Sequence, residues 1–217
     1  MSRPHLARNH YRPTSELGGA RLTRSYGLNP FLGPSGCALT HPIEALTVAA
    51  PYLSSWRIIA CLDYLLAHRI QVTKKIWLKP FDREEILRAL SLLTPRSRSV
   101  ERIARLLSHA VERTWSSAET LTRLLVLQNG FPPPSMNPLV VLDGRERFPD
   151  LAWTAKRTAL EYNSNHHAVD IRTYRDESYR LERFRDAGWK VRVLTWEDLR
   201  QPHRRAQWLG WLAQQLR

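Results

Sequence analysis

The chain has 217 residues, 43% of them hydrophobic and 24% charged, and its 33 lysines and arginines against 20 acidic residues leave a formal net charge of +13. This length suits one ordinary domain or two small ones, and the composition excludes collagen-like, coiled-coil and wholly disordered chains. No apolar run approaches the roughly 18 residues of a membrane-spanning helix. With two cysteines and no apolar leader, we expect a cytoplasmic protein that does not enter membranes.

The N-terminal half divides into an arm and a helical region. Arginine, proline, glycine and asparagine dominate residues 1–40, which predicts a basic, irregular or partly disordered arm. Apolar residues then recur at three- and four-residue steps, so we expect a small helical domain over residues 41–113. Within it, Asp82 with Glu85 is a candidate capping box, and a further helix is predicted over residues 99–111.

The second half opens with a helix and turns to strands. Ser116 or Ser117 is a candidate N-cap, and Asn129 followed by Gly130 is a helix stop. Three consecutive prolines over residues 132–134 forbid helix, so we expect an extended connection there.

Three strands are predicted after this connection. Residues 139–142 form the first, Asp143 and Gly144 give a strong hairpin turn, and residues 147–153 are the predicted return strand. Residues 158–162 form the third strand.

The pattern then alternates between helix and strand. A helical stripe runs from about Asp170 to Gly188, residues 189–194 alternate as a strand, and residues 204–216 form a last helix. The order predicts an α/β domain over residues 114–217. Three tryptophans within these patterns are predicted to lie in its core: Trp153, Trp189 and Trp196.

The positive charge is spread along the chain. There are 13 basic and 9 acidic residues from Asp150 onward, and 20 and 11 before it. Such a surplus is typical of proteins that bind a polyanion, which makes DNA the leading partner. The alternative is a GC-rich genome that favours arginine codons.

Two carboxylates are the first candidates for chemistry. Asp150 and Glu161 lie on adjacent predicted strands with a tight connection between them, so they can converge at one sheet edge. Hard oxygen ligands suit Mg²⁺, which binds one or two carboxylates together with substrate phosphate. Hydrolysis of a phosphodiester is the reaction that these groups would serve. The alternative is that both are ordinary acids at strand ends.

A series of short motifs follows in order over about the last hundred residues: Ser117-Ala118-Glu119-Thr120 with Arg123, Gly130-Phe131-Pro132-Pro133-Pro134, Asp150-Leu151-Ala152-Trp153, Leu160-Glu161-Tyr162-Asn163-Ser164-Asn165-His166-His167, Arg180, Gly188-Trp189-Lys190-Val191, and Thr195-Trp196-Glu197-Asp198-Leu199. In this combination the segment resembles the PD-(D/E)XK nuclease superfamily, specifically its Vsr-like (very-short-patch repair endonuclease-like) branch. The likeness is greatest to actinobacterial proteins that place such a domain behind a helical region similar to AbiEi-type antitoxins.

The resemblance implies a metal site. Asp150 and Glu161 match the two metal-binding carboxylates of the superfamily, and the backbone carbonyl of Tyr162 would be a further ligand. Glu119 matches the acidic residue on the helix before the sheet. The alternative for Glu119 is a carboxylate that favours the positive end of its helix.

The resemblance also implies a catalytic histidine. His167, with His166 as the less favoured choice, would act as general base or acid; the alternative is a solvated pair in a polar loop. Asn163 stands where the superfamily has its lysine. Asparagine can orient a water molecule but carries no charge to stabilise the transition state.

Basic side chains are the candidates for contact with nucleic acid. Arg180 would face the site or the DNA backbone, and we expect Lys156, Arg157 and Arg172 to contact DNA as well. An exposed helix face with charge pairs three and four residues apart is the alternative for the arginines of the long helix.

The fold implied is a restriction-endonuclease-like mixed sheet flanked by helices over residues 114–217. The activity implied is hydrolysis of DNA phosphodiester bonds that depends on Mg²⁺ or Mn²⁺. Two alternatives stay open: a non-catalytic DNA-binding regulator, or an antitoxin-like component of a defence or toxin–antitoxin system that needs a protein partner.

Overall fold

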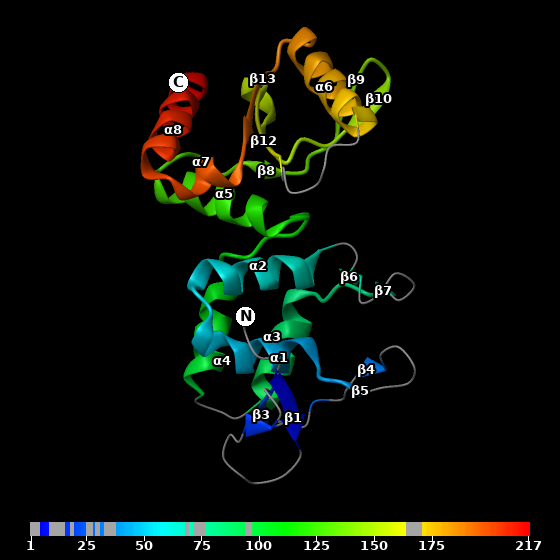
Figure 1. Cartoon of the computed structure of the whole chain (residues 1–217), viewed down its shortest axis with the longest axis vertical. Helices are drawn as coiled ribbons and strands as arrows, with labels where there is room; N and C mark the ends of the chain where they lie inside the picture. The colour runs from blue at the N-terminus through cyan, green and yellow to red at the C-terminus, as the bar shows by residue number, and fades with distance from the viewer. Residues whose placement is uncertain are drawn as a thin grey trace. The chain divides into compact units, whose positions relative to one another are not determined.

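Two units make up the chain, Met1–Val111 and Glu112–Arg217 (Figure 1). The boundary falls just before the one that the sequence predicts after Arg113. The computed structural model describes residues 5–8, 16–17, 20–24, 28, 31–32, 38–67, 70–71, 77–93, 97–163 and 171–217.

The first unit contains short strands that the sequence analysis does not predict: β1 to β5 lie in the predicted irregular arm, and β6 and β7 lie inside the predicted helical region. Among them β3 runs parallel to β1 and antiparallel to β2, while β4 pairs with β5 and β6 with β7, both antiparallel. They are two to five residues long, too short to show the alternation that predicts a strand. Their bounds are β1 His5–Arg8, β2 Glu16–Leu17, β3 Ala20–Arg24, β4 Phe31–Leu32, β5 Ala38–Leu39, β6 Ile70–Gln71 and β7 Trp77–Leu78.

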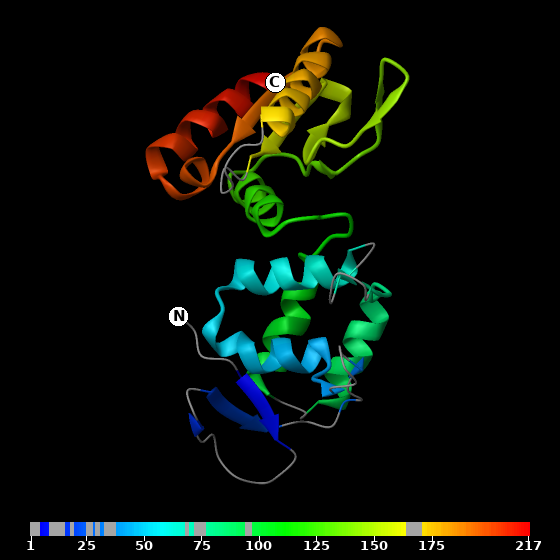
Figure 2. The ribbon, with the colours of Figure 1, turned by 45° about the vertical axis from the view of Figure 1, so that its right-hand side comes forward.

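The predicted helical region is confirmed, with β6 and β7 between its second and third helices. Its helices are α1 (Pro42–Ala49), α2 (Ser55–Leu66), α3 (Arg83–Leu92) and α4 (Arg98–Leu107), with the 3₁₀ turn η2 (Ala50–Tyr52) after α1. Figure 2 shows the four helices packed around one core. Every helix contributes fully buried side chains to that core, among them Ile43, Ile58, Leu62, Ile86 and Ile103.

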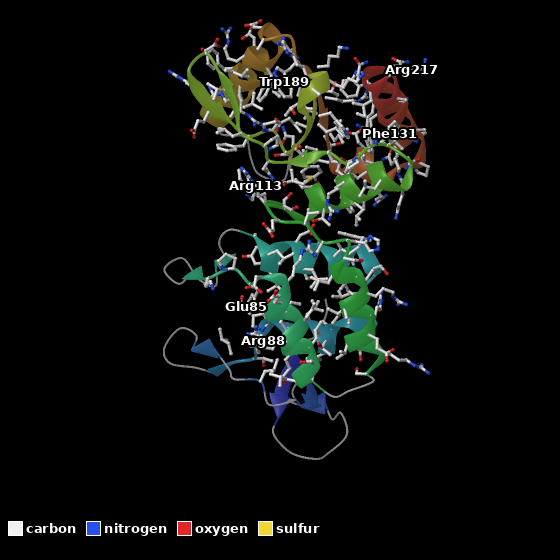
Figure 3. All side chains as sticks on the ribbon, turned by 180° about the vertical axis from the view of Figure 1, so that it is seen from behind. Glu85, Arg88, Arg113, Phe131, Trp189 and Arg217 are labelled. Carbon is white, nitrogen blue, oxygen red and sulfur yellow. The ribbon has the colours of Figure 1, made fainter. Side chains whose placement is uncertain are left out.

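The capping box of α3 is also confirmed. Asp82 accepts a hydrogen bond from the Glu85 N–H at 2.7 Å, and Glu85 (labelled in Figure 3) accepts one from the Asp82 N–H at 2.9 Å. Helix α4 ends at Leu107, before the predicted end at Val111. There the guanidinium of Arg83 donates to the carbonyls of Leu107 and Ala110, which satisfies acceptors that the helix end leaves open.

The second unit is a mixed α/β structure, as the sequence predicts at the level of fold class. Its sheet has the strand order β13-β12-β11-β8, with β12 and β13 parallel and the other pairs antiparallel. Strands β9 and β10 form a separate antiparallel hairpin. The elements are α5 Ser117–Gln128, β8 Ser135–Met136, β9 Val140–Leu142, β10 Arg145–Arg147, β11 Leu151–Trp153, η3 Thr154–Lys156, β12 Thr158–Tyr162, α6 Ile171–Asp186, β13 Lys190–Leu194, α7 Trp196–Arg200 and α8 Pro202–Leu216.

The return strand of the hairpin differs from the prediction over residues 147–153. Asp143 and Gly144 both have positive φ, 50° and 70°, so the two-residue turn places the return strand directly after them. Pro149 lacks an N–H and cannot continue a hydrogen-bonded ladder, which interrupts the chain before β11. The predicted single strand is therefore two strands in two sheets.

Helices cover both sides of the four-stranded sheet. Figures 1 and 2 show α6 on one side of β13 and α8 on the other. On the α6 side, Phe184 packs with Ala152, Ala159 and Trp189 in one buried cluster. Trp153 and Trp189 are buried as predicted. For Trp196 the prediction of a core position is wrong, because this residue is the first of α7 and 37% of its surface is exposed.

No helix among the described residues is long and apolar enough to cross a bilayer.

Candidate functional site

The candidate site lies where β11 begins and β12 ends. Figures 1 and 2 show α5 and α7 at this end of the sheet, where β12 and β13 terminate. Leu151 pairs with Leu160 in the antiparallel register, so continuing the register by one residue places Asp150 opposite Glu161. Residues directly opposite in an antiparallel pair share a face of the sheet.

Asp150 is tied to the end of β12. Its Oδ2 accepts a hydrogen bond from the Tyr162 N–H at 2.8 Å. The next N–H, that of Asn163, points to the other neighbouring strand and donates to the Leu194 carbonyl at 2.8 Å. The Asp150 carboxylate thus receives an N–H from the edge of β12 that faces β11, which fixes its position at the end of the sheet.

Glu119 reaches the same region from the first turn of α5. Its N–H donates to the Ser116 hydroxyl, which confirms Ser116 as the cap, and its Oε2 accepts from the Trp115 N–H at 3.0 Å and from the Asn137 amide at 2.7 Å. The side chain is 4% exposed. A carboxylate that served only to cap the helix would have no need to leave water.

The charge state of Glu119 reflects its surroundings. Burial, and after it the negative charge of Asp150, raise the pKa of this carboxyl, while hydrogen bonds from Trp115, Asn137 and Ser116 lower it. The net result is a rise of the pKa from 4.5 to about 6. Asp150 and Glu119 therefore act on each other as like charges, one of them deep in the protein.

Glu161 has a different partner. Its side chain is 3% exposed, and Arg180 of α6 binds both of its oxygens, with Nη2–Oε2 at 2.8 Å and Nη1–Oε1 at 3.3 Å. Since Ala159 and Glu161 lie two residues apart on β12, both face α6. Arg180 thus engages the carboxylate that the sequence assigns to a metal, and its contact with DNA stays a prediction.

The other predicted catalytic residues are described only in part. Asn163 follows β12 and is half-buried, and its N–H donates to the Leu194 carbonyl. For the Tyr162 carbonyl a ligand role stays a prediction. His166 and His167 lie outside the described residues.

The predicted DNA-contact residues are spread over the unit. Lys156 and Arg157 are exposed at η3, where Lys156 Nζ donates to the Arg217 backbone oxygen at 2.8 Å and Arg157 Nη1 to the Ala187 carbonyl at 3.4 Å. Arg172 lies in α6, and its side chain is outside the described residues. The structure does not bring Lys156 or Arg157 to the Glu161–Arg180 pair by any hydrogen bond or ion pair recorded for the described residues.

The carboxylates fit a magnesium ion in part. Glu119 and Asp150 offer hard oxygen ligands, and a cation beside them would offset the repulsion that raises the Glu119 pKa. Glu161 fits only once Arg180 has moved, because a guanidinium and a cation compete for the same oxygens. No group of three or more histidine, cysteine, aspartate or glutamate side chains is arranged for a metal ion within the part of the chain described.

Two residues of the site are missed by the sequence analysis. Asn137 is fully buried with φ at 43°, and it donates to Glu119, to the Arg113 carbonyl, and through its N–H to the Asp150 carbonyl at 3.0 Å. Arg113, labelled in Figure 3, donates to the Asn137 carbonyl at 3.0 Å. The Asn-Pro dipeptide at 137–138 is a turn signal that could have drawn attention to it.

Comparisons of the chain with protein-family models, with curated proteins and with solved structures gave no match. A functional assignment therefore rests on the residues of this chain and on their geometry.

Proposed function

We propose that the second unit is a metal-dependent endonuclease-like domain that hydrolyses DNA phosphodiester bonds. The observation that carries the proposal is the pairing of Asp150 with the buried Glu119 at one end of the sheet, where the charge of one raises the pKa of the other. A buried carboxylate beside a second carboxylate is costly for a fold, and carboxyl groups whose pKa is shifted in this way are found preferentially at functional sites.

The cation would be Mg²⁺ or Mn²⁺. Asp150 and Glu119 would hold it, with Glu161 and the Tyr162 carbonyl as further ligands. When bound, such an ion polarises the scissile phosphate and lowers the pKa of a bound water. Asn137 and the Tyr162 N–H keep the two carboxylates in place by their hydrogen bonds.

Two further side chains have roles in the proposal. Asn163, at the end of β12, would orient a water molecule, and His167 would move a proton to or from the reacting groups. Arg180, Lys156, Arg157 and Arg172 would contact phosphates, in keeping with the net charge of +13.

The architecture supports a restriction-endonuclease-like fold. In that reading the antiparallel strands β11 and β12 carry the carboxylates, and the long helix α6 leads from β12 to the parallel strand β13. The resemblance of the motifs from Ser117 to Leu199 points the same way. A cytoplasmic location and a partner in a defence or toxin–antitoxin system belong to the same proposal.

One observation favours a second function, that of a non-catalytic DNA-binding regulator. Glu161 is neutralised by Arg180, and Asn163 replaces the lysine of the superfamily. A domain with both changes could keep the fold and the DNA affinity without hydrolysis. In that case Asn163→Lys would restore cleavage to an inactive wild type.

Cleavage of supercoiled plasmid separates the two functions. The purified chain is incubated with plasmid in Mg²⁺, Mn²⁺ or EDTA beside Asp150→Asn, which keeps an oxygen acceptor for the Tyr162 N–H. Asp143→Asn in the exposed hairpin turn is the matched control, since asparagine also accepts a positive φ there. We expect cleavage with either cation, none in EDTA, and loss in Asp150→Asn alone. Cleavage that persists in EDTA or in Asp150→Asn contradicts the proposal, and no cleavage under any condition gives the regulator first place.

A further inference from the structure

The contact between Arg180 and Glu161 lies between α6 and the sheet, beside the buried apolar cluster of Ala159 and Phe184. Glu161 lies on β12, which has β11 on one side and β13 on the other, and its face of the sheet is covered by α6. Both guanidinium nitrogens of the Arg180 fork bind one carboxylate oxygen each, at 2.8 and 3.3 Å. This is the strong, planar form of the arginine–carboxylate pair.

A positive partner stabilises a carboxylate that is buried away from water. Arg180 is that partner, and it is held from a rigid base, because Phe184, one turn further along α6, is fully buried against Trp189. The guanidinium end is less enclosed, since 29% of the Arg180 side chain is exposed against 3% of Glu161. The Arg180 side chain can therefore leave Glu161 by a change of rotamer, without movement of α6 or of Glu161.

We propose that Arg180 is an internal counter-ion that a divalent cation must displace before Glu161 becomes a metal ligand. The inference rests on the proposed function, since the competing cation is the one assigned to Asp150 and Glu119. It concerns a different property, namely the condition under which Glu161 binds the cation beside Asp150 and Glu119. Guanidinium and cation exclude each other on Glu161 by like charge and by use of the same oxygens.

Displacement leaves a guanidinium fork beside the site. Phosphate fits this fork as well as carboxylate does. The released Arg180 then binds a DNA phosphate, so that DNA and the cation each favour binding of the other. In the absence of DNA, Arg180 occupies the Glu161 carboxylate, so Glu161 is not a ligand of the cation.

Binding of Mn²⁺ without DNA tests this inference and does not depend on activity. Free Mn²⁺ is measured by electron paramagnetic resonance during titration of the full-length chain. Arg180→Gln removes the competing charge, so we expect its Mn²⁺ affinity to rise about tenfold over wild type, within the usual range of coupling between sites. In Glu161→Gln/Arg180→Gln the gain should vanish. Arg183→Gln is the matched control on the same helix, because Arg183 pairs with Asp186 at 2.8 Å, and it should bind as wild type does.

An Mn²⁺ affinity in Arg180→Gln equal to or below that of wild type overturns the inference. If Asp150→Asn still lowers the wild-type affinity in that case, the proposed function survives; if no variant binds Mn²⁺ and plasmid cleavage is absent, both fail. Arg180→Lys guards against misfolding of the glutamine variant, since it keeps the charge and loses the fork. Its Mn²⁺ affinity should lie between those of wild type and Arg180→Gln, and an affinity equal to wild type overturns the inference as well.

Discussion

The pKa of the Glu119 carboxyl is raised from 4.5 to about 6, because burial and the charge of Asp150 both disfavour its ionised form. The folded state therefore binds a proton more tightly than the unfolded state does. The stability that this proton contributes is complete below pH 4.5 and is lost as the pH rises through about 6. A rise of this size corresponds to about 2 kcal/mol.

The comparison of wild type with Glu119→Gln measures this effect. Glutamine keeps the shape and an acceptor for Asn137, and it does not ionise. Wild type should lose this contribution as the pH rises from 4.5 to 7, and Glu119→Gln should not. In EDTA, we therefore expect the difference in free energy of unfolding, Glu119→Gln minus wild type, to increase by up to about 2 kcal/mol over this range. Urea unfolding at a series of pH values gives the difference. A difference that is the same at every pH would contradict the buried, proton-sensitive carboxyl.

His167 is the residue through which the mechanism is tested. If it moves a proton in the reaction, His167→Ala should lower the cleavage rate by roughly 10² to 10⁴, the usual contribution of a positioned acid or base. DNA affinity should stay nearly unchanged. As a general base His167 would also make the rate fall on acidification through about pH 6 to 7.

Single-turnover cleavage of plasmid measures the rate, and His203→Ala in the exposed part of α8 is the control. Equal rates in His167→Ala and wild type would remove the histidine from the mechanism. A loss confined to His166→Ala would move the assignment to its neighbour.

At the scale of elements, Asp198 joins α7 to α8. Its Oδ2 accepts from the N–H and the hydroxyl of Thr195, at 2.8 and 2.7 Å, and its Oδ1 accepts from Arg204 Nε at 2.9 Å. Burial alone would raise the pKa of Asp198, but the bonds from Arg204 and Thr195 and the charge of Arg204 lower it. The ionised form is therefore the one that stabilises the junction.

Replacement of Asp198 by asparagine should lower the free energy of unfolding of the second unit by roughly 1.5 to 3 kcal/mol at pH 7, the usual value for hydrogen bonds to a charged group. Because the pKa is lowered, this contribution is present above the ordinary value of 3.8 and is lost as the pH falls through the lowered pKa. Urea unfolding followed by tryptophan fluorescence gives both numbers. Glu197→Gln, exposed on the same helix, should change the free energy by less than about 0.5 kcal/mol, and a similar loss in both variants would refute the role of Asp198.

The elements that could be predicted are those set by nearby residues. The capping box of Asp82 and Glu85, the cap at Ser116 and the strand over residues 158–162 all follow from local pattern, and the structure has each of them. Helix α7 has five residues, too few to show a period, and its one local signal is Thr195 with Asp198 three residues later, a capping box that the sequence analysis leaves out. The division of residues 145–153 between two sheets depends on pairing with distant strands, which no local pattern contains.

The site shows the same limit. Asp150 and Glu161 could be singled out because carboxylates follow one another across a strand connection. The ion pair of Glu161 with Arg180 could not, since it joins residues 19 positions apart through the packing of α6 on the sheet. Asn137 likewise becomes a partner of Glu119 only when β8 is placed beside β11.

At the scale of the whole molecule, the positive charge predicts how DNA is bound. Each phosphate contact releases counterions, so the logarithm of affinity should fall linearly with the logarithm of salt concentration, at about −0.9 per contact on duplex DNA. Fluorescence anisotropy of a labelled duplex measures this slope. Asp150→Asn should bind DNA at least as tightly as wild type, because it removes a negative charge. An affinity that hardly changes between low and physiological salt would remove nucleic acid as the partner of this surface charge.

The position of the cation tests the central claim most directly. Crystals of the chain grown or soaked with Mn²⁺ would be measured at a wavelength where manganese scatters anomalously. We predict an anomalous peak that marks a cation bound to carboxylate oxygens of both Asp150 and Glu119. Its distance from these oxygens should be close to the Mg²⁺–oxygen distance of about 2.0 to 2.1 Å, and Asp150→Asn should show no such peak. A peak elsewhere in the second unit, or none at Asp150 at a cation concentration that supports plasmid cleavage, would contradict the account.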